Sequence, residues 1–200
     1  MNMDKIFWEN YYKENKIPFQ PSPFAKSVLE SLEKNSTLID IGCGNGRDSI
    51  YFSNNKIHTF GVDQSKNSIE NLKQYENKFL KFKRIDISEL DDDEFEYGYC
   101  RFLFHSINEQ DEKKLLVWLK KNIKNQIFIE SRIDIDKDKY KDTDHYRRLM
   151  NIELFKEKLK NLNFKIESEN ISSTFSFYDT SYNVKDIIFN PNLVRFVLRP

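Results

Sequence analysis

Three of the five glycines in the chain stand within five positions of one another, in the segment LIDIGCGNGRD at residues 38–48. The spacing is Asp40-x-Gly42-x-Gly44-x-Gly46, directly behind an apolar run. Glycine permits a positive φ angle and lets a ligand approach the main chain, because it has no Cβ atom. The N–H groups of a helix that follows such a turn favour a carboxylate or a phosphate. The pattern therefore predicts a turn that binds a small ligand through its backbone.

Two further acidic residues follow apolar runs in the same way. Asp63 ends the segment FGVD, and its carboxylate could accept hydrogen bonds from both hydroxyls of a ribose. Asp86 ends the segment KRID, where it could meet the exocyclic amine of an adenine. The alternatives are that the glycines only form a tight turn, that Asp63 only caps a helix at residue 65, and that Asp86 is a solvated acid at a strand end.

Elements of two kinds must position these residues. Apolar runs predict strands at residues 37–42, 57–63, 79–86, 97–104 and 126–132. Helical patterns at 46–55, 65–77 and 108–124 alternate with them, which indicates crossover units and a mainly parallel sheet. The carboxyl ends of parallel strands meet at one edge, where open sheets of this kind bind ligands. The three acids should therefore share that edge.

The last third of the chain has a different pattern. A helix is predicted at about 151–161, followed by strands at 164–171 and 192–199 with no convincing helix between them. Two strands joined without a crossover helix are more easily antiparallel. Another helix is predicted near the N-terminus, where Trp8, Tyr11 and Tyr12 have helical spacing.

The segments LIDIGCGNGRD, GVDQS and RIDIS together resemble the class I S-adenosylmethionine-dependent methyltransferases, over nearly the whole chain. Residues 7–28, 100–107, 128–132 and 144–151 resemble, more narrowly, a bacterial subgroup of capsule and surface-glycan biosynthesis. The resemblance implies an α/β fold with a Rossmann-like, seven-stranded, mostly parallel sheet, an antiparallel last strand and helices on both faces. It also implies S-adenosyl-L-methionine as the cofactor.

The resemblance extends to individual positions of the cofactor site. The family's first motif, around the methionine part of the cofactor, matches Asp40, Gly42, Gly44 and Gly46. The ribose acid matches Asp63, with Gln64 behind it, and the adenine side of the pocket matches Asp86 and Ile87. The end of the fourth strand, which lies beside cofactor and substrate, matches Arg101 and Phe102. In the N-terminal segment, Tyr12 could reach the carboxylate of the cofactor; the alternative is an aromatic stripe that packs against the sheet, which is the expectation for Trp8.

Four arginines follow the fourth and fifth predicted strands or lie in the loop above them: Arg101, Arg132, Arg147 and Arg148. Arginine binds planar anions bidentately and stays charged at any relevant pH. These residues are candidates for a clamp on a phosphate- or carboxylate-bearing substrate. The alternative for the last two is a surface ion pair with Asp142 or Asp144, and such pairs contribute little to stability.

Two histidines are candidate bases, because His105 follows the fourth strand and His145 stands beside the arginines. Methyl transfer needs a general base only if the attacking group is protonated with a high pKa, as in a sugar hydroxyl. An anionic oxygen would need cations instead. The alternative for either histidine is a hydrogen-bonded packing residue. No set of His, Cys and Asp residues has metal-ligand spacing, so no metal site is expected.

Composition excludes several classes of protein. The chain of 200 residues carries 32 basic and 32 acidic side chains, which argues against a general nucleic-acid binder. No apolar stretch has the length of a membrane span, and the N-terminus does not resemble a secretory signal. The two cysteines have no CxxC spacing, so a reduced, cytoplasmic compartment is expected. The oligomeric state is not indicated.

We therefore expect one domain over residues 1–200, with an N-terminal helix and lid segment (1–30), a cofactor-binding core (36–132) and a substrate-side loop, helix and strand pair (133–200). The expected function is methyl transfer to a small, anionic metabolite or sugar intermediate, as O-methylation in capsule or polysaccharide biosynthesis. The alternatives are a non-catalytic nucleotide- or cofactor-binding module, and a detoxifying methyltransferase that acts on a thiol, an amine or an oxyanion.

Overall fold

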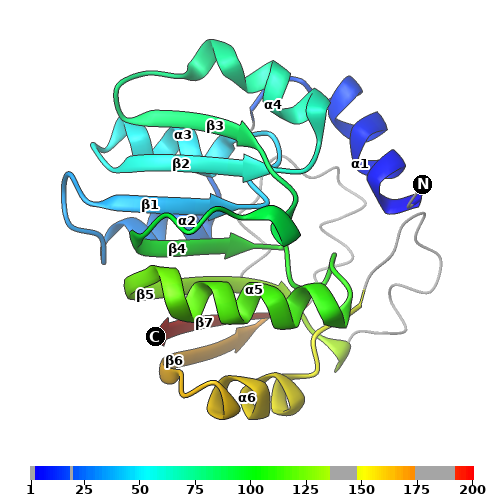
Figure 1. The fold of residues 1–200 in the computed structure, drawn as a ribbon, viewed down its shortest axis with the longest axis vertical. Helices are drawn as coiled ribbons and strands as arrows, with labels where there is room; N and C mark the ends of the chain where they lie inside the picture. The colour runs from blue at the N-terminus through cyan, green and yellow to red at the C-terminus, as the bar shows by residue number, and fades with distance from the viewer. Residues whose placement is uncertain (1–2, 19, 136–147, 174–191) are drawn as a thin grey trace.

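The computed structural model describes residues 3–18, 20–135, 148–173 and 192–200, and a single seven-stranded sheet organises them (Figure 1). The strand order is β3-β2-β1-β4-β5-β7-β6. The strands are β1 (Thr37–Ile41), β2 (His58–Asp63), β3 (Leu80–Arg84), β4 (Phe95–Arg101), β5 (Ile123–Arg132), β6 (Lys165–Ser172) and β7 (Leu193–Arg199). Neighbouring strands from β3 to β5 are parallel, whereas β7 runs antiparallel to both β5 and β6. The fold expected from the sequence, with an antiparallel last strand, is confirmed.

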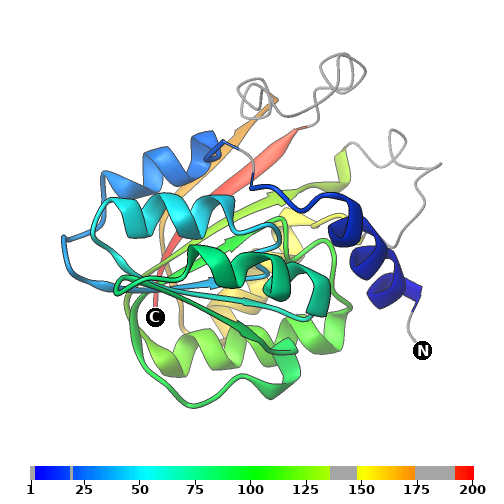
Figure 2. The same cartoon turned by 90° about the horizontal axis from the view of Figure 1, so that it is seen from above.

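Helices cover both faces of this sheet (Figures 1 and 2). The α-helices are α1 (Met3–Glu14), α2 (Pro23–Leu29), α3 (Arg47–Asn54), α4 (Lys66–Leu72), α5 (Glu109–Asn122) and α6 (Ile152–Asn161). Helices α2 and α3 lie on one face and α5 on the other, while α1 lies beyond the carboxyl ends of the strands. Within the described residues, no helix is long and apolar enough to cross a bilayer.

Alternation along the strands divides the core between the two faces. Leu38 and Tyr99 point toward α2 and α3, where they pack with Phe52. Their neighbours Ile39 and Cys100 point the other way and join the larger cluster beneath α5 and α6. This period-two pattern is what a buried sheet requires, because successive side chains leave a strand on opposite faces.

The strand order reverses at β1, whose two neighbours are β2 and β4. From β1 the chain moves outward to β2 and β3, then crosses back to β4 and continues outward in the other direction. In open α/β sheets this switch point leaves a crevice at the carboxyl ends of the strands, and ligands bind there.

Among the element boundaries that differ from the sequence expectation are the end of β4 and the end of α4. Strand β4 ends at Arg101 rather than at residue 104, because Phe102 adopts a left-handed backbone with φ of 57°. The helix expected at 65–77 ends at Leu72 and continues only as a short 3₁₀ turn over Lys73–Tyr75. The first difference bears on the site, since left-handed non-glycine residues are strained and cluster at functional positions.

Candidate active site

A cavity of about 1080 Å³ opens at the carboxyl ends of β1, β2 and β4. Its lining brings together the glycine turn, the three acids, the end of β4 and one side of α1. The expected site residues that line it are Tyr12, Asp40, Gly42, Gly44, Asp63, Gln64, Asp86, Ile87, Arg101, Phe102, His105 and Arg132. The cavity lies at the upper end of the usual range for ligand sites, so it can hold a cofactor and a second small molecule.

The glycine turn requires its glycines for two separate reasons. Gly42, Gly44 and Gly46 have φ angles of 75°, 55° and 72°, which other residues rarely adopt. At Gly44 an added Cβ atom would also lie 2.5 Å from the hydroxyl of Tyr12, so the Tyr12 side chain would have to move. The turn begins where the amides of Gly42 and Cys43 both donate to the carbonyl of Val62, at 2.8 and 3.0 Å. The glycine turn expected from the sequence is therefore present, and the Tyr12 hydroxyl lies over Gly44.

Asp63 ends β2 and ties the glycine turn to helix α4. One of its carboxylate oxygens accepts a 3.0 Å hydrogen bond from the Gly44 amide, and the other accepts a 2.9 Å bond from the Ser65 amide. Burial raises the pKa of Asp63, and these two amide hydrogen bonds oppose that rise. Each carboxylate oxygen has a second lone pair, so Asp63 can accept ribose hydroxyls while keeping its structural bonds.

Asp40 is the most deeply placed acid of the cavity, with 3 % of its surface exposed. Its side chain accepts a 2.5 Å hydrogen bond from the hydroxyl of Ser49, on helix α3. Burial raises the pKa of Asp40 to about 8; the Ser49 hydrogen bond opposes the rise, and the nearby carboxylates of Asp48 and Asp63 add to it. A cationic group beside Asp40 would reverse this shift, since it would favour the ionised form.

Asp86 lies two residues beyond the end of β3 and has a cationic partner that sequence reasoning missed. Lys5 of helix α1 lies 2.5 Å from its carboxylate, which also accepts hydrogen bonds from the amide and hydroxyl of Ser88. Burial works against ionisation here, but the bonds from Lys5 and Ser88 prevail and lower the pKa of Asp86. Asp86 is therefore more than a solvated acid, because it joins α1 to the rim of the cavity.

A second contact places α1 over the site. The carboxylate of Glu9 accepts hydrogen bonds from the amides of Lys66 (2.7 Å) and Asn67 (3.0 Å) and from the hydroxyl of Ser65 (3.0 Å). These groups form the first turn of α4, whose free N–H groups favour a negative charge. The expected lid segment is thus tied to the cofactor-binding half at both Asp86 and α4. No local pattern in the sequence indicates this pairing across nearly 60 residues.

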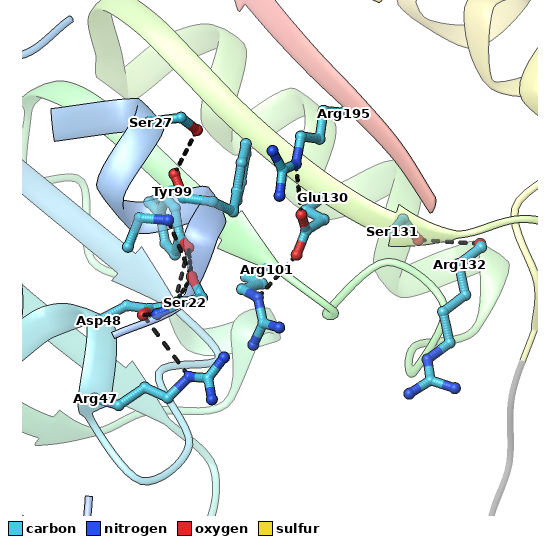
Figure 3. A network of polar contacts seen from close by, with 12 residues as sticks. Ser22, Ser27, Arg47, Asp48, Tyr99, Arg101, Glu130, Ser131, Arg132 and Arg195 are labelled. Atoms are coloured by element: carbon cyan, nitrogen blue, oxygen red, sulfur yellow. Dashed lines mark hydrogen bonds and ion pairs between the residues drawn. The ribbon is translucent and has the colours of Figure 1, made fainter. Parts of the chain in front are cut away.

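Arg101 ends β4 and is held in place by a buried carboxylate (Figure 3). Its Nε donates a 2.8 Å hydrogen bond to Glu130 of β5, and Glu130 also accepts a 2.6 Å bond from Nε of Arg195 on β7. Glu130 is only 2 % exposed. Figure 3 shows the Nε atom of Arg101 turned toward Glu130 and the terminal guanidinium nitrogens directed away from it, and Arg101 lines the cavity. An acid within the apolar run QIFIESR was the sequence signal for a buried charge of this kind.

Arg47 is a second arginine of the cavity that sequence reasoning left out, although it directly follows Gly46 in the quoted segment. It begins helix α3, is 7 % exposed, and has its Nε 3.8 Å from the carboxylate of Asp48. Asp48 is fixed in turn by the amide and hydroxyl of Ser22 and by the hydroxyl of Tyr99, at 2.7 to 2.9 Å. In Figure 3 the guanidinium groups of Arg47 and Arg101 point into the same space.

Arg132 and Phe102 meet on the other side of Arg101. The guanidinium carbon of Arg101 lies 4.1 Å from the centre of the Phe102 ring, and that of Arg132 lies 5.2 Å from it. Guanidinium groups stack favourably on aromatic rings and keep their planar edges available for an anion. Phe102 thus holds two of the expected clamp arginines in one part of the cavity.

His105 lies in the same part of the cavity and is 4 % exposed. Its Nδ1 atom is 3.4 Å from the backbone nitrogen of Arg132 and 3.4 Å from the hydroxyl of Ser131. A backbone amide can only donate, so Nδ1 is assigned as the acceptor and the neutral ring carries its proton on Nε2. In this tautomer Nε2 donates a hydrogen bond and cannot accept a proton.

The remaining candidates lie elsewhere. Arg148 corrects the sequence expectation, because its guanidinium is bound by Glu112 and by the carbonyls of Phe104 and Ile107 instead of lining the cavity. The chain therefore uses Arg148 to anchor the segment that leads into α6. His145 and Arg147 lie outside the described residues.

These features fit S-adenosylmethionine as a ligand. The glycine turn, the carboxylates of Asp40, Asp63 and Asp86, and the guanidinium groups of Arg47 and Arg101 line one cavity. Asp40, whose burial disfavours a lone negative charge, is complementary to a cationic ligand. The cavity is also large enough for the whole cofactor.

Comparison with known proteins supports the same conclusion. Residues 32–166 match a family described as methyltransferase domain. No curated protein sequence matches the chain.

Solved structures share the fold at low sequence identity. A SAM-dependent methyltransferase from Methanosarcina mazei superposes with a TM-score of 0.71 at 12 % identity, over 90 % of this chain and 99 % of that one. A TehB-like SAM-dependent methyltransferase from Corynebacterium glutamicum superposes with a TM-score of 0.67 at 14 % identity, over 89 % of this chain and 87 % of that one. Magnesium protoporphyrin IX methyltransferase from Synechocystis, with bound SAH, superposes with a TM-score of 0.65 at 13 % identity, over 88 % of this chain and 80 % of that one.

The family match covers more than half of the chain, and its boundaries enclose the glycine turn, the three acids and strands β1 to β5. The chain therefore belongs to the methyltransferase-domain family, and it is a methyltransferase whose site fits S-adenosylmethionine as the cofactor.

Proposed function

We propose that the enzyme transfers a methyl group to an oxygen of a small, anionic acceptor that bears a phosphate or a carboxylate. The observation that supports this is the position of Arg101 and Arg132, whose guanidinium groups flank Phe102 in the cavity that also holds Asp40 and Asp63. The buried Glu130 fixes Arg101 before any ligand binds, and preorganised cations suit an anionic group.

Residues of the chain divide between cofactor and acceptor in this proposal. Asp63 accepts the ribose hydroxyls, Asp86 and Ile87 line the adenine side, and Asp40 faces the positive charge of the methionine part. Arg47, with Tyr12, holds the cofactor's carboxylate beside the glycine turn. Arg132 is left for the acceptor, with Arg101 between the two. When bound, S-adenosylmethionine supplies an activated methyl group on its sulfonium.

The state of His105 supports an acceptor that is already ionised. Its Nδ1 faces the amide of Arg132, so its Nε2 is a donor and suits an oxygen anion. An ionised oxygen needs no general base, and positioning by fixed cations then provides most of the rate enhancement. A sugar hydroxyl would require a base, and His145 is the other histidine that the sequence offers for this role.

A role in capsule or polysaccharide biosynthesis, with a sugar intermediate as the second kind of acceptor, is supported by the resemblance of residues 7–28, 100–107, 128–132 and 144–151. We infer this role from the sequence resemblance alone. The positions of the arginine side chains support the anionic acceptor and not the biosynthetic role. The family match favours an enzyme over the alternative of a non-catalytic cofactor-binding module.

Fractionated metabolites test the proposed acceptor class. The purified enzyme is incubated with S-adenosylmethionine and a bacterial small-molecule extract that has been separated on an anion exchanger, and S-adenosylhomocysteine is measured. The proposal predicts product formation in the retained, anionic fraction. Arg132→Gln should lose most of this activity and still bind S-adenosylhomocysteine within about twofold.

Arg199→Gln is the matched control, because Arg199 is half exposed and pairs with Glu167 at the far end of β7. This variant should keep full activity. Product formation confined to the unretained or cationic fractions would contradict an anionic acceptor and would favour a neutral alcohol, a thiol or an amine.

A further inference from the structure

Helix α1 lines the cavity with four aromatic side chains: Phe7, Trp8, Tyr11 and Tyr12. They form two stacked pairs along the helix. The rings of Phe7 and Tyr11 lie 6.3 Å apart at 21°, and those of Trp8 and Tyr12 lie 5.9 Å apart at 22°. Four rings on one side of a single helix form a wall whose faces and edges favour planar, conjugated ligands.

The two pairs point in different directions around helix α1. Successive residues of an α-helix are about 100° apart, so Phe7 lies about 160° around the helix from Lys5, and Tyr11 about 160° from Glu9. Lys5 and Glu9 hold the flank of α1 that faces Asp86 and α4. The pair of Phe7 and Tyr11 therefore lies on the flank turned away from the ribose and adenine acids.

Tyr12 belongs to the cofactor side, because its hydroxyl approaches the glycine turn at Gly44 and its backbone carbonyl accepts a 2.9 Å bond from Asn71 of α4. Trp8 is stacked on Tyr12. Phe7 and Tyr11 also line the cavity, from the side of α1 opposite Lys5 and Glu9.

Another wall of the cavity combines a ring with positive charge. Phe102 lies between the guanidinium groups of Arg101 and Arg132, at 4.1 and 5.2 Å. A cavity with aromatic rings on one wall and ring-stacked guanidinium groups on another is complementary to a planar ring that carries an anionic substituent.

We propose that the acceptor is an aromatic or heteroaromatic acid, with its ring against the Phe7–Tyr11 flank of α1 and its anionic group at Arg132. This inference rests on the proposed function. Of the two kinds of acceptor named there, an anionic metabolite and a sugar intermediate, it favours the anionic metabolite. The competing assignment of the same rings is to the adenine of the cofactor, and the test separates the two.

The probes are 2-naphthoate and decahydro-2-naphthoate, two carboxylates of similar size of which only the first is aromatic. Their dissociation constants are measured by calorimetry on the full chain saturated with S-adenosylhomocysteine. Aromatic stacking adds to simple burial, so 2-naphthoate should bind roughly two- to tenfold more tightly. The double variant Phe7→Leu/Tyr11→Leu should abolish that preference and leave the affinity for S-adenosylhomocysteine within about twofold.

Ile6→Ala is the matched control, because Ile6 lies on the same helix, is exposed, and does not line the cavity. It should keep the preference. Equal affinities of the two probes for the wild-type chain, or no binding of either, would overturn the proposal without any variant. A double variant that loses S-adenosylhomocysteine and keeps the preference would assign the rings to the cofactor and would also overturn it. Failure of the wild-type chain to bind S-adenosylhomocysteine would instead refute the proposed function.

Discussion

Arg101 donates its Nε hydrogen to Glu130 over 2.8 Å, and this bond connects the cavity to the antiparallel end of the sheet. Glu130 is shared with Arg195 of β7, so one buried carboxylate orients a guanidinium group of the site and joins β4, β5 and β7. The strand pair that distinguishes this sheet from a fully parallel one therefore also supports the site.

Removing the carboxylate of Glu130 should lower the free energy of unfolding. Glu130→Ala leaves two poorly exposed guanidinium groups without their shared partner, and breaking a buried ion pair in this way typically costs about 3–5 kcal/mol. Urea unfolding of the two chains measures the difference. Glu167→Ala is the control, since Glu167 of β6 pairs with Arg199 of β7 at the surface, where a cost of about 1 kcal/mol or less is expected. Equal losses in the two variants would contradict the buried role of Glu130.

Asp40 should make the ligand-free chain less stable as the pH rises. The pKa of Asp40 is about 8 in the folded chain and about 3.9 in an unfolded one, so the folded state binds more protons between these values. Stability then falls with increasing pH across that window, by at most about 1.4 kcal/mol per pH unit, and the effect is absent below pH 3.9.

Asp40→Asn removes the titrating group and keeps its shape. Between pH 6 and pH 7.5, the free energy of unfolding of the variant should rise by about 2 kcal/mol relative to that of the wild type. Chemical unfolding without ligand measures this difference. It should also bind S-adenosylmethionine more weakly, because the carboxylate that faces the cationic ligand is lost. Parallel stability profiles of the two chains would show that Asp40 is ionised in the free enzyme.

The attachment of α1 should depend on Glu9. Burial opposes ionisation of Glu9, but hydrogen bonds from Asn67, Lys66 and Ser65 outweigh it and lower its pKa. The attachment is therefore complete above the ordinary pKa of a glutamate and is lost as the pH falls through the lowered value. At neutral pH, Glu9→Ala should speed amide hydrogen exchange in residues 3–14 and weaken S-adenosylhomocysteine binding at least threefold. Exposed Glu14 provides the control, and equal exchange in Glu9→Ala and Glu14→Ala would rule out the contact.

His105 offers a test of whether a base is used. Glutamine can place an N–H near the position of Nε2, so His105→Gln keeps the donor and removes any basic nitrogen. We expect turnover within about fivefold of the wild type on the anionic acceptor, and a rate that shows no ionisation near pH 6.5. Loss of general-base catalysis would instead reduce turnover by about 10²–10⁴, and a fall of that size would refute the assigned tautomer.

The sequence predicted best those features that depend on local pattern. Strands β1 to β3 and the glycine turn follow from apolar runs and glycine spacing, and they place Asp40, Asp63 and Asp86 at one rim. Parallel strands that share an edge leave little freedom in that arrangement. The end of β4 could not be predicted in the same way, because the left-handed backbone of Phe102 has no signal in its residue type.

Contacts between distant segments were not predictable from pattern alone. Glu130 and Arg195 are 65 residues apart, and their pairing exists only because β7 returns beside β5. Arg148 was expected at the cavity from its place in the chain, yet Glu112 of α5 binds it elsewhere. The sequence near a strand end shows which charged residues could line the cavity. Tertiary packing decides which of them do so.

Calorimetric titration of S-adenosylhomocysteine into the wild-type chain and Asp63→Asn tests the central claim most directly. Asparagine keeps the size of the side chain but replaces one acceptor oxygen with a donor, so a ligand held through its ribose should lose about tenfold or more in affinity. We predict one binding site per chain in the wild type and this loss in the variant. Absence of binding to the wild type at millimolar ligand, or equal affinities of the two chains, would contradict the account.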